Sequence, residues 1–99
     1  MPTQYEWDEA KRETNLAKHG LDFADADLVL ESPYRWTVAV VHGTEVRQHS
    51  IAYVFERLVV LTLVHTDREG VVRCISFRPA SRAERAAYHE WLATYQEIE

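Results

Sequence analysis

The order of hydrophobic and polar positions divides the chain into a helical first third, an extended middle and a helical end. Residues 9–19 predict a helix, because Asp8 can cap its first turn and Gly20 can end its last one. Residues 23–31 follow a second capping residue, Asp22, and carry apolar side chains at helical spacing. They therefore predict a second helix.

Four stretches then alternate as strands do, with short turns between them: WTVAVV, EVRQHSIAYVF, LVVLTLVHT and VVRCISFR. The third is apolar on both faces, so we expect it to be the central strand, with residues 58–64 almost wholly buried. Ser81 and Glu84 form the capping box of a last helix. Residues 1–99 are thus predicted to form one α+β domain: two N-terminal helices, a four-stranded antiparallel sheet and a C-terminal helix.

Composition excludes several classes of protein. The chain has 99 residues, of which 46% are hydrophobic and 27% charged, an ordinary globular profile. Its lone cysteine, Cys74, has no partner for an internal disulfide, so a reducing compartment is expected. The first residues are charged and the longest apolar run is LVVLTLV, so neither a signal peptide nor a membrane span is predicted. We expect a cytoplasmic protein that does not associate with membranes.

The formal charge of -5 hides a basic middle. Residues 35–88 hold eight arginines against five acidic side chains. Arg78 lies at a strand end, and Arg82 and Arg85 follow in the first turn of the last helix, where cations beside free N–H groups make a natural phosphate site. Arg73 and Arg78 belong on opposite faces of their strand unless a bulge intervenes. The alternative is that each arginine is solvated or pairs with a nearby acid.

Groups able to transfer protons fall near the same strand ends. Glu45, Arg47 and His49 share one face of the second strand, and His65 and Arg68 lie at the end of the third. Cleavage of a phosphodiester requires a proton acceptor, a proton donor and positive charge for the phosphorane. These side chains include all three.

Other conspicuous side chains have simpler explanations. The five histidines show no H-x-H or H-x-x-x-H pairing, so no metal site is predicted. Cys74, in mid-strand, is expected to be a buried and inert thiol. Trp7 and Trp91 are expected in the core or at an interface, and Trp36 fits either a core role or a nucleic-acid contact. His19 either contacts RNA or stabilises the C-terminal end of its helix.

The segment YEWDEAKRETNLAKHGLDFADADLVLESP, followed by TEVR, VHTDREG and VRCISFRPASRAERAAY, resembles the BrnT toxin family. The family pattern is an aromatic residue, x, W-D, then K, N, K-H-G and an amphipathic F-x-x-A segment. It continues with E-x-R, H-T-x-R and the block R-I-I-S-A-R-x-A-x-x-x-E-R-x-x-Y. The resemblance spans residues 5 to 88. Phe77 and Pro79 depart from it, since the family has a small alanine and an often basic residue there.

The resemblance implies a RelE-like fold and a metal-independent ribonuclease toxin that needs no cofactor. It also implies a cognate BrnA-like ribbon-helix-helix antitoxin, which neutralises the toxin and binds operator DNA. We expect the RNA 2′-hydroxyl to attack the adjacent phosphorus, with His65 as first choice for proton transfer and Glu45 or His49 as second. The predicted catalytic residues are His65, Arg47, Arg73, Arg78 and Glu45. The predicted RNA-binding residues are Arg68, Arg82, Arg85, Lys18 and His49.

Three functions remain open at this point. The chain is an RNA-cleaving toxin, a binding module of the same fold that acts as corepressor with its antitoxin, or a sheet domain that binds nucleic acid or protein without a toxin role. A basic cleft on an acidic protein predicts that an acidic or amphipathic antitoxin segment covers the arginines. The last helix offers Ala83, Ala87, Trp91 and Thr94 at near-helical spacing, either for docking or for the core.

Overall fold

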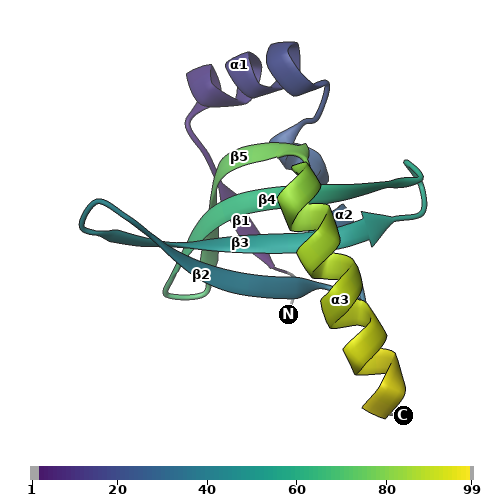
Figure 1. Cartoon of the computed structure of the whole chain (residues 1–99). Helices are drawn as coiled ribbons and strands as arrows, with labels where there is room; N and C mark the ends of the chain where they lie inside the picture. Colours follow the sequence, from purple (N-terminus) through teal and green to yellow (C-terminus); the bar gives the residue numbers. More distant parts are fainter. Residues whose placement is uncertain (1–2, 99) are drawn as a thin grey trace.

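The computed structural model describes residues 3–98 and consists of a five-stranded mixed sheet with helical segments on both faces (Figure 1). The strands are β1 (Gln4–Glu6), β2 (Trp36–His42), β3 (Glu45–Val54), β4 (Val59–Arg68) and β5 (Val71–Pro79). Their order is β1-β5-β4-β3-β2, in which β1 runs parallel to β5 and every other pair is antiparallel. The helical segments are α1 (Glu9–His19), the 3-10 turn η1 (Phe23–Asp25), α2 (Asp27–Leu30) and α3 (Arg82–Ile98).

This architecture is α+β, but it corrects the predicted fold in two respects. Gln4–Glu6 forms a fifth strand that makes the sheet mixed, and three residues are too few to show an alternating pattern in the sequence. The predicted second helix is η1 followed by the single turn α2. The Asp22 side chain accepts from the Ala24 N–H, so it caps a tight turn rather than a long helix. The four antiparallel strands are therefore preceded by one full-length helix, not two.

Several local predictions are confirmed. Asp8 accepts from the Lys11 N–H at 3.1 Å, and Gly20 ends α1 at φ 69, where a side chain would be strained. β4 is the central strand, as its two apolar faces predicted. Its burial begins at Val60, however. Leu58 is 76% exposed at φ 54 in the turn before the strand, so its predicted burial is wrong.

The sheet buries a cluster of apolar side chains on each face. One face packs against η1 and α2 through Phe23, Ala26, Val29, Ala52, Val54, Leu61, Leu63, Cys74 and Phe77. The opposite face packs against α3 through Ile51, Val60, Ala80 and Tyr88, with Tyr53, Trp91 and Leu92 partly buried around them. Cys74 is buried, as expected, and burial raises the pKa of its thiol to about 12. Phe77, which departs from the family pattern, is also buried and fills the core. We call these the η1 face and the α3 face.

A bulge in β5 changes which of its side chains share a face. Val64 of β4 pairs with Ser76, but the next residue, His65, pairs with Cys74, so Ile75 is an extra residue. An inserted residue reverses the alternation of side chains on the two sides of it. Arg73 and Arg78 therefore lie on the same face, which is the case that the sequence allowed only with a bulge.

Asn15 of α1 holds β5 just beyond this bulge. Its amide oxygen accepts from the Phe77 N–H at 3.0 Å, and its amide nitrogen donates to the Phe77 carbonyl at 2.8 Å and to the Leu21 carbonyl at 3.0 Å. β1 pairs only with residues 71–73 of β5. The Asn15 side chain thus takes the place of a neighbouring strand at Phe77. Figure 1 shows α1 beside β5 at this side of the sheet.

The Asn15→Ala variant should lose about 2–4 kcal/mol of unfolding free energy, because it leaves buried backbone groups of Phe77 and Leu21 without partners. Urea unfolding measures this loss. Thr14→Ala is the matched control, since Thr14 is the preceding residue on the exposed side of α1 and bonds only to the Ala10 carbonyl. A loss of similar size in both variants would contradict the role of Asn15.

Candidate active site

Side chains of β3, β4 and β5, most of them polar, form three rows across the α3 face. The register places Ile51 of β3, Thr62 of β4 and Arg78 of β5 in the first row, since Thr62 pairs with both of its neighbours. His49, Val64 and Ser76 form the second row in the same way. In the third row Arg73 pairs with Thr66, and continuation of the register places Arg47 on the other side of Thr66. His49 therefore lies in the middle row, and the row on each side of it contains at least one arginine.

Glu84 of α3 reaches into this face and contacts three of its side chains. Its carboxylate accepts two hydrogen bonds from the Arg78 guanidinium, at 2.6 and 3.0 Å, and one from the Thr62 hydroxyl at 3.1 Å. The Nδ1 atom of His49 lies 3.7 Å from Glu84 Oε2. Glu84 also accepts from the Ser81 N–H at 2.8 Å, which completes the predicted capping box. Glu84 links the start of α3 to the sheet.

The Glu84 carboxylate stays ionised over a wide pH range. Burial opposes its charge, but hydrogen bonds from Arg78, the Ser81 N–H and Thr62 outweigh burial and lower the pKa to about 2. Glu84 is therefore no proton donor near neutral pH and acts as a fixed anion that orients Arg78 and lies 3.7 Å from His49 Nδ1. Sequence reasoning identified Glu84 only as a capping residue. Its position six residues after an arginine at a strand end was the available signal for this second contact.

The other two predicted catalytic arginines also face carboxylates. Arg47 donates from Nε to Glu45 at 2.8 Å, and this hydrogen bond lowers the pKa of Glu45. A carboxylate whose pKa is lowered is a weaker proton acceptor, which disfavours Glu45 as general base. The Arg73 guanidinium lies 3.6 Å from Glu6 of β1, and its side chain remains 49% exposed.

His65 does not join the arginines. It pairs with Cys74, and its ring contacts Ser50 and Asp67 on the η1 face, so the sheet separates it from Arg47, Arg73 and Arg78. Its side chain is only 3% exposed. The predicted constellation of His65 with three arginines is not formed. Alternation along the third strand cannot show by itself that His65 lies on the face opposite the arginines. That conclusion also requires knowing on which face the arginines of the neighbouring strands lie.

The predicted RNA-binding residues surround the α3 face. Arg82 and Arg85 are exposed in the first turn of α3, and Arg68 is exposed at the end of β4. Lys18 lies in a groove of about 310 Å³ between α1 and the β5 bulge, with His19, Lys11 and Ser76. Burial lowers the pKa of His19, and the charges of Lys18 and Arg78 lower it further. His19, for which the sequence left two explanations open, is thus close enough to Arg78 to feel its charge.

An apolar cavity of about 230 Å³ adjoins His49 on the same face. It lies between β2, β3 and α3 and is lined by Trp36, Val38, Val40, Ile51, Ala83 and Ala87. Trp36 stacks on Trp91 with ring centroids 6.2 Å apart, so it belongs to the core and to this wall at once. An apolar slot beside an imidazole is suited to a planar ligand group.

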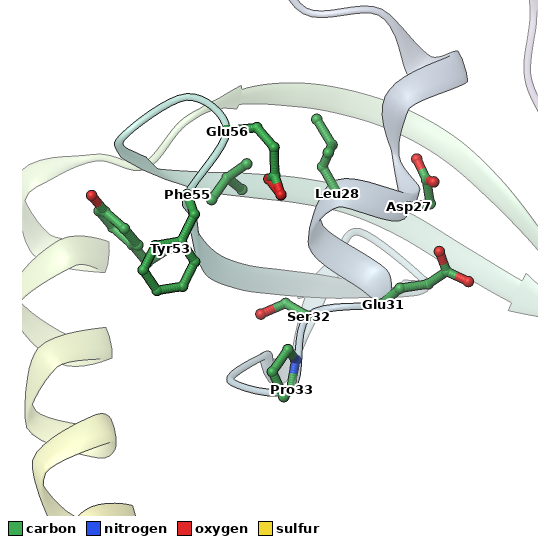
Figure 2. A pocket seen from close by; sticks show the side chains of 9 residues that line it. Asp27, Leu28, Glu31, Ser32, Pro33, Tyr53, Phe55 and Glu56 are labelled. Atoms are coloured by element: carbon green, nitrogen blue, oxygen red, sulfur yellow. The ribbon is translucent and has the colours of Figure 1, made fainter.

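A further pocket, of about 270 Å³, opens between α2 and the turn after β3 (Figure 2). Figure 2 shows the carboxylates of Asp27, Glu31 and Glu56 around it, together with Tyr53 and Phe55. Three carboxylates repel phosphate groups, so this pocket is unsuited to RNA.

The described part of the chain lacks both a metal-binding cluster and a membrane-spanning helix. Within residues 3–98, no group of three or more His, Cys, Asp or Glu side chains is placed to hold a metal ion. Over the same residues, no helix has both the length and the apolar composition needed to cross a bilayer.

Comparison with known proteins gives one result. The family model described as "Ribonuclease toxin, BrnT, of type II toxin-antitoxin system" matches residues 7–84, which is well over half of the chain. This range contains Asn15, His49, Arg78 and Glu84. No curated protein matches the chain.

The Glu84→Gln variant should lower the unfolding free energy by about 1–3 kcal/mol at pH 7, because an amide accepts the Arg78 bonds less strongly than a carboxylate. The folded-state pKa lies below the ordinary value, so the stabilisation is present above about pH 4.5 and disappears as the pH falls to about 2. Urea unfolding from pH 7 to pH 2 should show the two proteins converging over that range. Glu90→Gln, on the exposed side of α3, is the matched control. A pH-independent difference would contradict the assignment.

Proposed function

Because the chain belongs to the BrnT family of ribonuclease toxins of type II toxin-antitoxin systems, we propose that it cleaves RNA on the α3 face of its sheet. Membership of this family implies an RNA target and an antitoxin partner. The finer statements are our proposal: cleavage without a metal ion, His49 as the proton acceptor, and a BrnA-like antitoxin. The observation that supports it most is the position of His49 between rows that contain Arg78 on one side and Arg47 and Arg73 on the other.

Each side chain of this face has a separate task in the proposed reaction. His49 accepts the proton of the RNA 2′-hydroxyl, whose oxygen attacks the adjacent phosphorus. Arg78 and Arg73 donate hydrogen bonds to the equatorial phosphoryl oxygens as negative charge develops there. The bond from phosphorus to the 5′ oxygen then breaks, and water protonates the departing oxygen. The products are a 2′,3′-cyclic phosphate and a 5′-hydroxyl.

The surrounding groups support binding rather than chemistry. Arg82, Arg85, Arg68 and Lys18 are placed to hold flanking phosphates, which contributes affinity that falls as salt rises. The apolar cavity beside His49 is suited to hold the nucleobase next to the scissile bond. The sequence assigned proton transfer first to His65. The proposal assigns it to His49 instead, because the buried His65 ring on the η1 face has no access to a phosphate bound by Arg78.

A second function is favoured by one observation. Arg78, Arg47 and Arg73 each already face a carboxylate of the same chain, at 2.6, 2.8 and 3.6 Å. A cleft neutralised in this way suits a corepressor that binds its antitoxin and no longer cleaves RNA. Expression of the chain alone in a bacterium separates the two functions, since only a nuclease arrests growth.

The antitoxin is expected to cover the α3 face with an acidic or amphipathic segment. Such a segment competes with RNA for the arginines and fills the apolar cavity next to His49. Co-expressed toxin and BrnA-like antitoxin should elute together in size-exclusion chromatography. Arg78→Glu should weaken the complex, whereas Arg57→Glu, at the turn between β3 and β4, should leave it intact.

The purified chain should cleave RNA in EDTA and leave 2′,3′-cyclic phosphate ends. His49→Ala should lower kcat by about 10²–10⁴ through loss of the proton acceptor. Arg73→Ala should lower it by about 10²–10³ through loss of one donor to the phosphorane. Arg57→Ala is the matched control and should retain activity. Cleavage that requires a divalent ion, fragments with 3′-hydroxyl ends, or an unimpaired His49→Ala enzyme would each overturn the proposed reaction.

A further inference from the structure

A chain of hydrogen bonds crosses the η1 face, away from the proposed nuclease site. Asp67 Oδ1 lies 2.7 Å from His65 Nδ1, His65 Nε2 lies 2.8 Å from Ser50 Oγ, and Ser50 Oγ lies 2.8 Å from Thr37 Oγ1. Ser50 is fully buried and His65 is 2% exposed, whereas Thr37 is exposed. The chain therefore connects a buried imidazole to a hydroxyl at the surface.

The direction of these hydrogen bonds follows from the charge of His65. Burial lowers the pKa of His65, although the Asp67 carboxylate opposes this and Arg35 and His49 assist it. The ring is therefore neutral at pH 7. An ionised carboxylate only accepts, so Nδ1 carries the ring proton and Nε2 accepts from Ser50. Ser50 in turn accepts from Thr37, and Thr37 Oγ1 presents free lone pairs to the outside.

The outer end of this chain opens into a pocket of about 280 Å³. Thr3, Leu30, Arg35, Thr37, Ser50, His65, Asp67 and Val72 line it. Arg35 donates from Nη1 to the Leu30 carbonyl at 2.7 Å, which fixes the guanidinium at the rim. The pocket thus combines a positioned cation with a hydroxyl oxygen that can accept a hydrogen bond, two residues apart at the start of β2. Its volume lies just below the range of about 300–1,000 Å³ that is usual for ligand sites, so it suits a small ligand group.

We propose that this pocket binds a ribonucleotide through its 3′-phosphate and the adjacent 2′-hydroxyl. The phosphate accepts hydrogen bonds from Arg35, and the 2′-hydroxyl donates to Thr37 Oγ1. A deoxynucleotide lacks this donor, so the pocket distinguishes RNA ends from DNA ends. Binding here needs no cleavage on the α3 face, and the site accepts a ribonucleotide whether or not the chain is a nuclease.

Protonation of His65 reverses the direction of the hydrogen bonds along this chain. An imidazolium donates from Nε2 to Ser50, Ser50 then donates to Thr37, and the Thr37 hydroxyl proton points outward. A 2′-hydroxyl can accept as well as donate, so it then accepts from Thr37 and the hydrogen bond persists in the opposite direction. The other groups around the ring are Asp67 of β4, His49 of β3, Arg35 and the neutral Cys74 thiol of β5. Preference for the ribonucleotide should therefore survive as the pH falls through the pKa of His65.

Titration of the whole chain with uridine 3′-monophosphate and with 2′-deoxyuridine 3′-monophosphate, followed by NMR of the histidine rings and backbone amides, tests this assignment. The ribonucleotide should bind about 3- to 10-fold more tightly at pH 7, as one hydrogen bond allows, with shifts at His65 and Thr37. The preference should persist when the pH is lowered.

Three variants make the result specific. Thr37→Val keeps a β-branched side chain in the strand and should abolish the preference, whereas Thr44→Val in the turn between β2 and β3 should preserve it. Arg35→Gln should weaken both nucleotides equally. Arg78→Ala, which disables the proposed nuclease face, should leave the preference unchanged. Shifts confined to His49 and Arg78, a preference that survives Thr37→Val, or equal binding of the two nucleotides would overturn the assignment.

Discussion

The extra residue in β5 determines which side chains of this protein can act together. With Ile75 inserted opposite the step from Val64 to His65, Arg73 and Arg78 share the face that carries α3. Without it they would lie on opposite sides of the sheet, and one of the two rows beside His49 would lose its β5 arginine. The bulge needs support because an extra residue leaves the strand ladder interrupted. Asn15 supplies that support when it bonds both backbone groups of Phe77.

The sequence predicted those parts of the fold that depend on local chemistry. The caps at Asp8, Gly20 and Ser81, the strand pattern and the central position of β4 need only neighbouring residues. β1 was missed because three residues become a strand only when β5 offers an edge to pair with. The second helix failed for a related reason, since Asp22 is held by Arg12 at 2.7 and 2.8 Å while it caps the turn of η1.

The candidate site was predictable as a set of residue types but not as a geometry. Arginines, His49 and Glu45 were all recognised from spacing and charge. Their division between faces was not, because one bulge and the pairing of β4 decide it. His65 illustrates the difference. Its ordinary pKa made it the first choice as a base, yet burial and the hydroxyl of Ser50 place it in a separate network.

Glu84 explains how the arginine cluster exists before any ligand binds. Arginines gathered on one face repel one another, and an acidic partner within the same chain relieves that repulsion. Phosphate offers the Arg78 guanidinium the same paired oxygen geometry as a carboxylate, so a bound phosphate can share or take over this contact.

Glu84 does not lose its place when this happens, because the Ser81 N–H and the Thr62 hydroxyl continue to hold it. Because Glu84 caps α3 as well as facing Arg78, the start of α3 stays folded when Arg78 changes partner. In the proposed reaction the same carboxylate stays near His49 Nδ1, so its negative charge remains beside the proton acceptor when a phosphate binds.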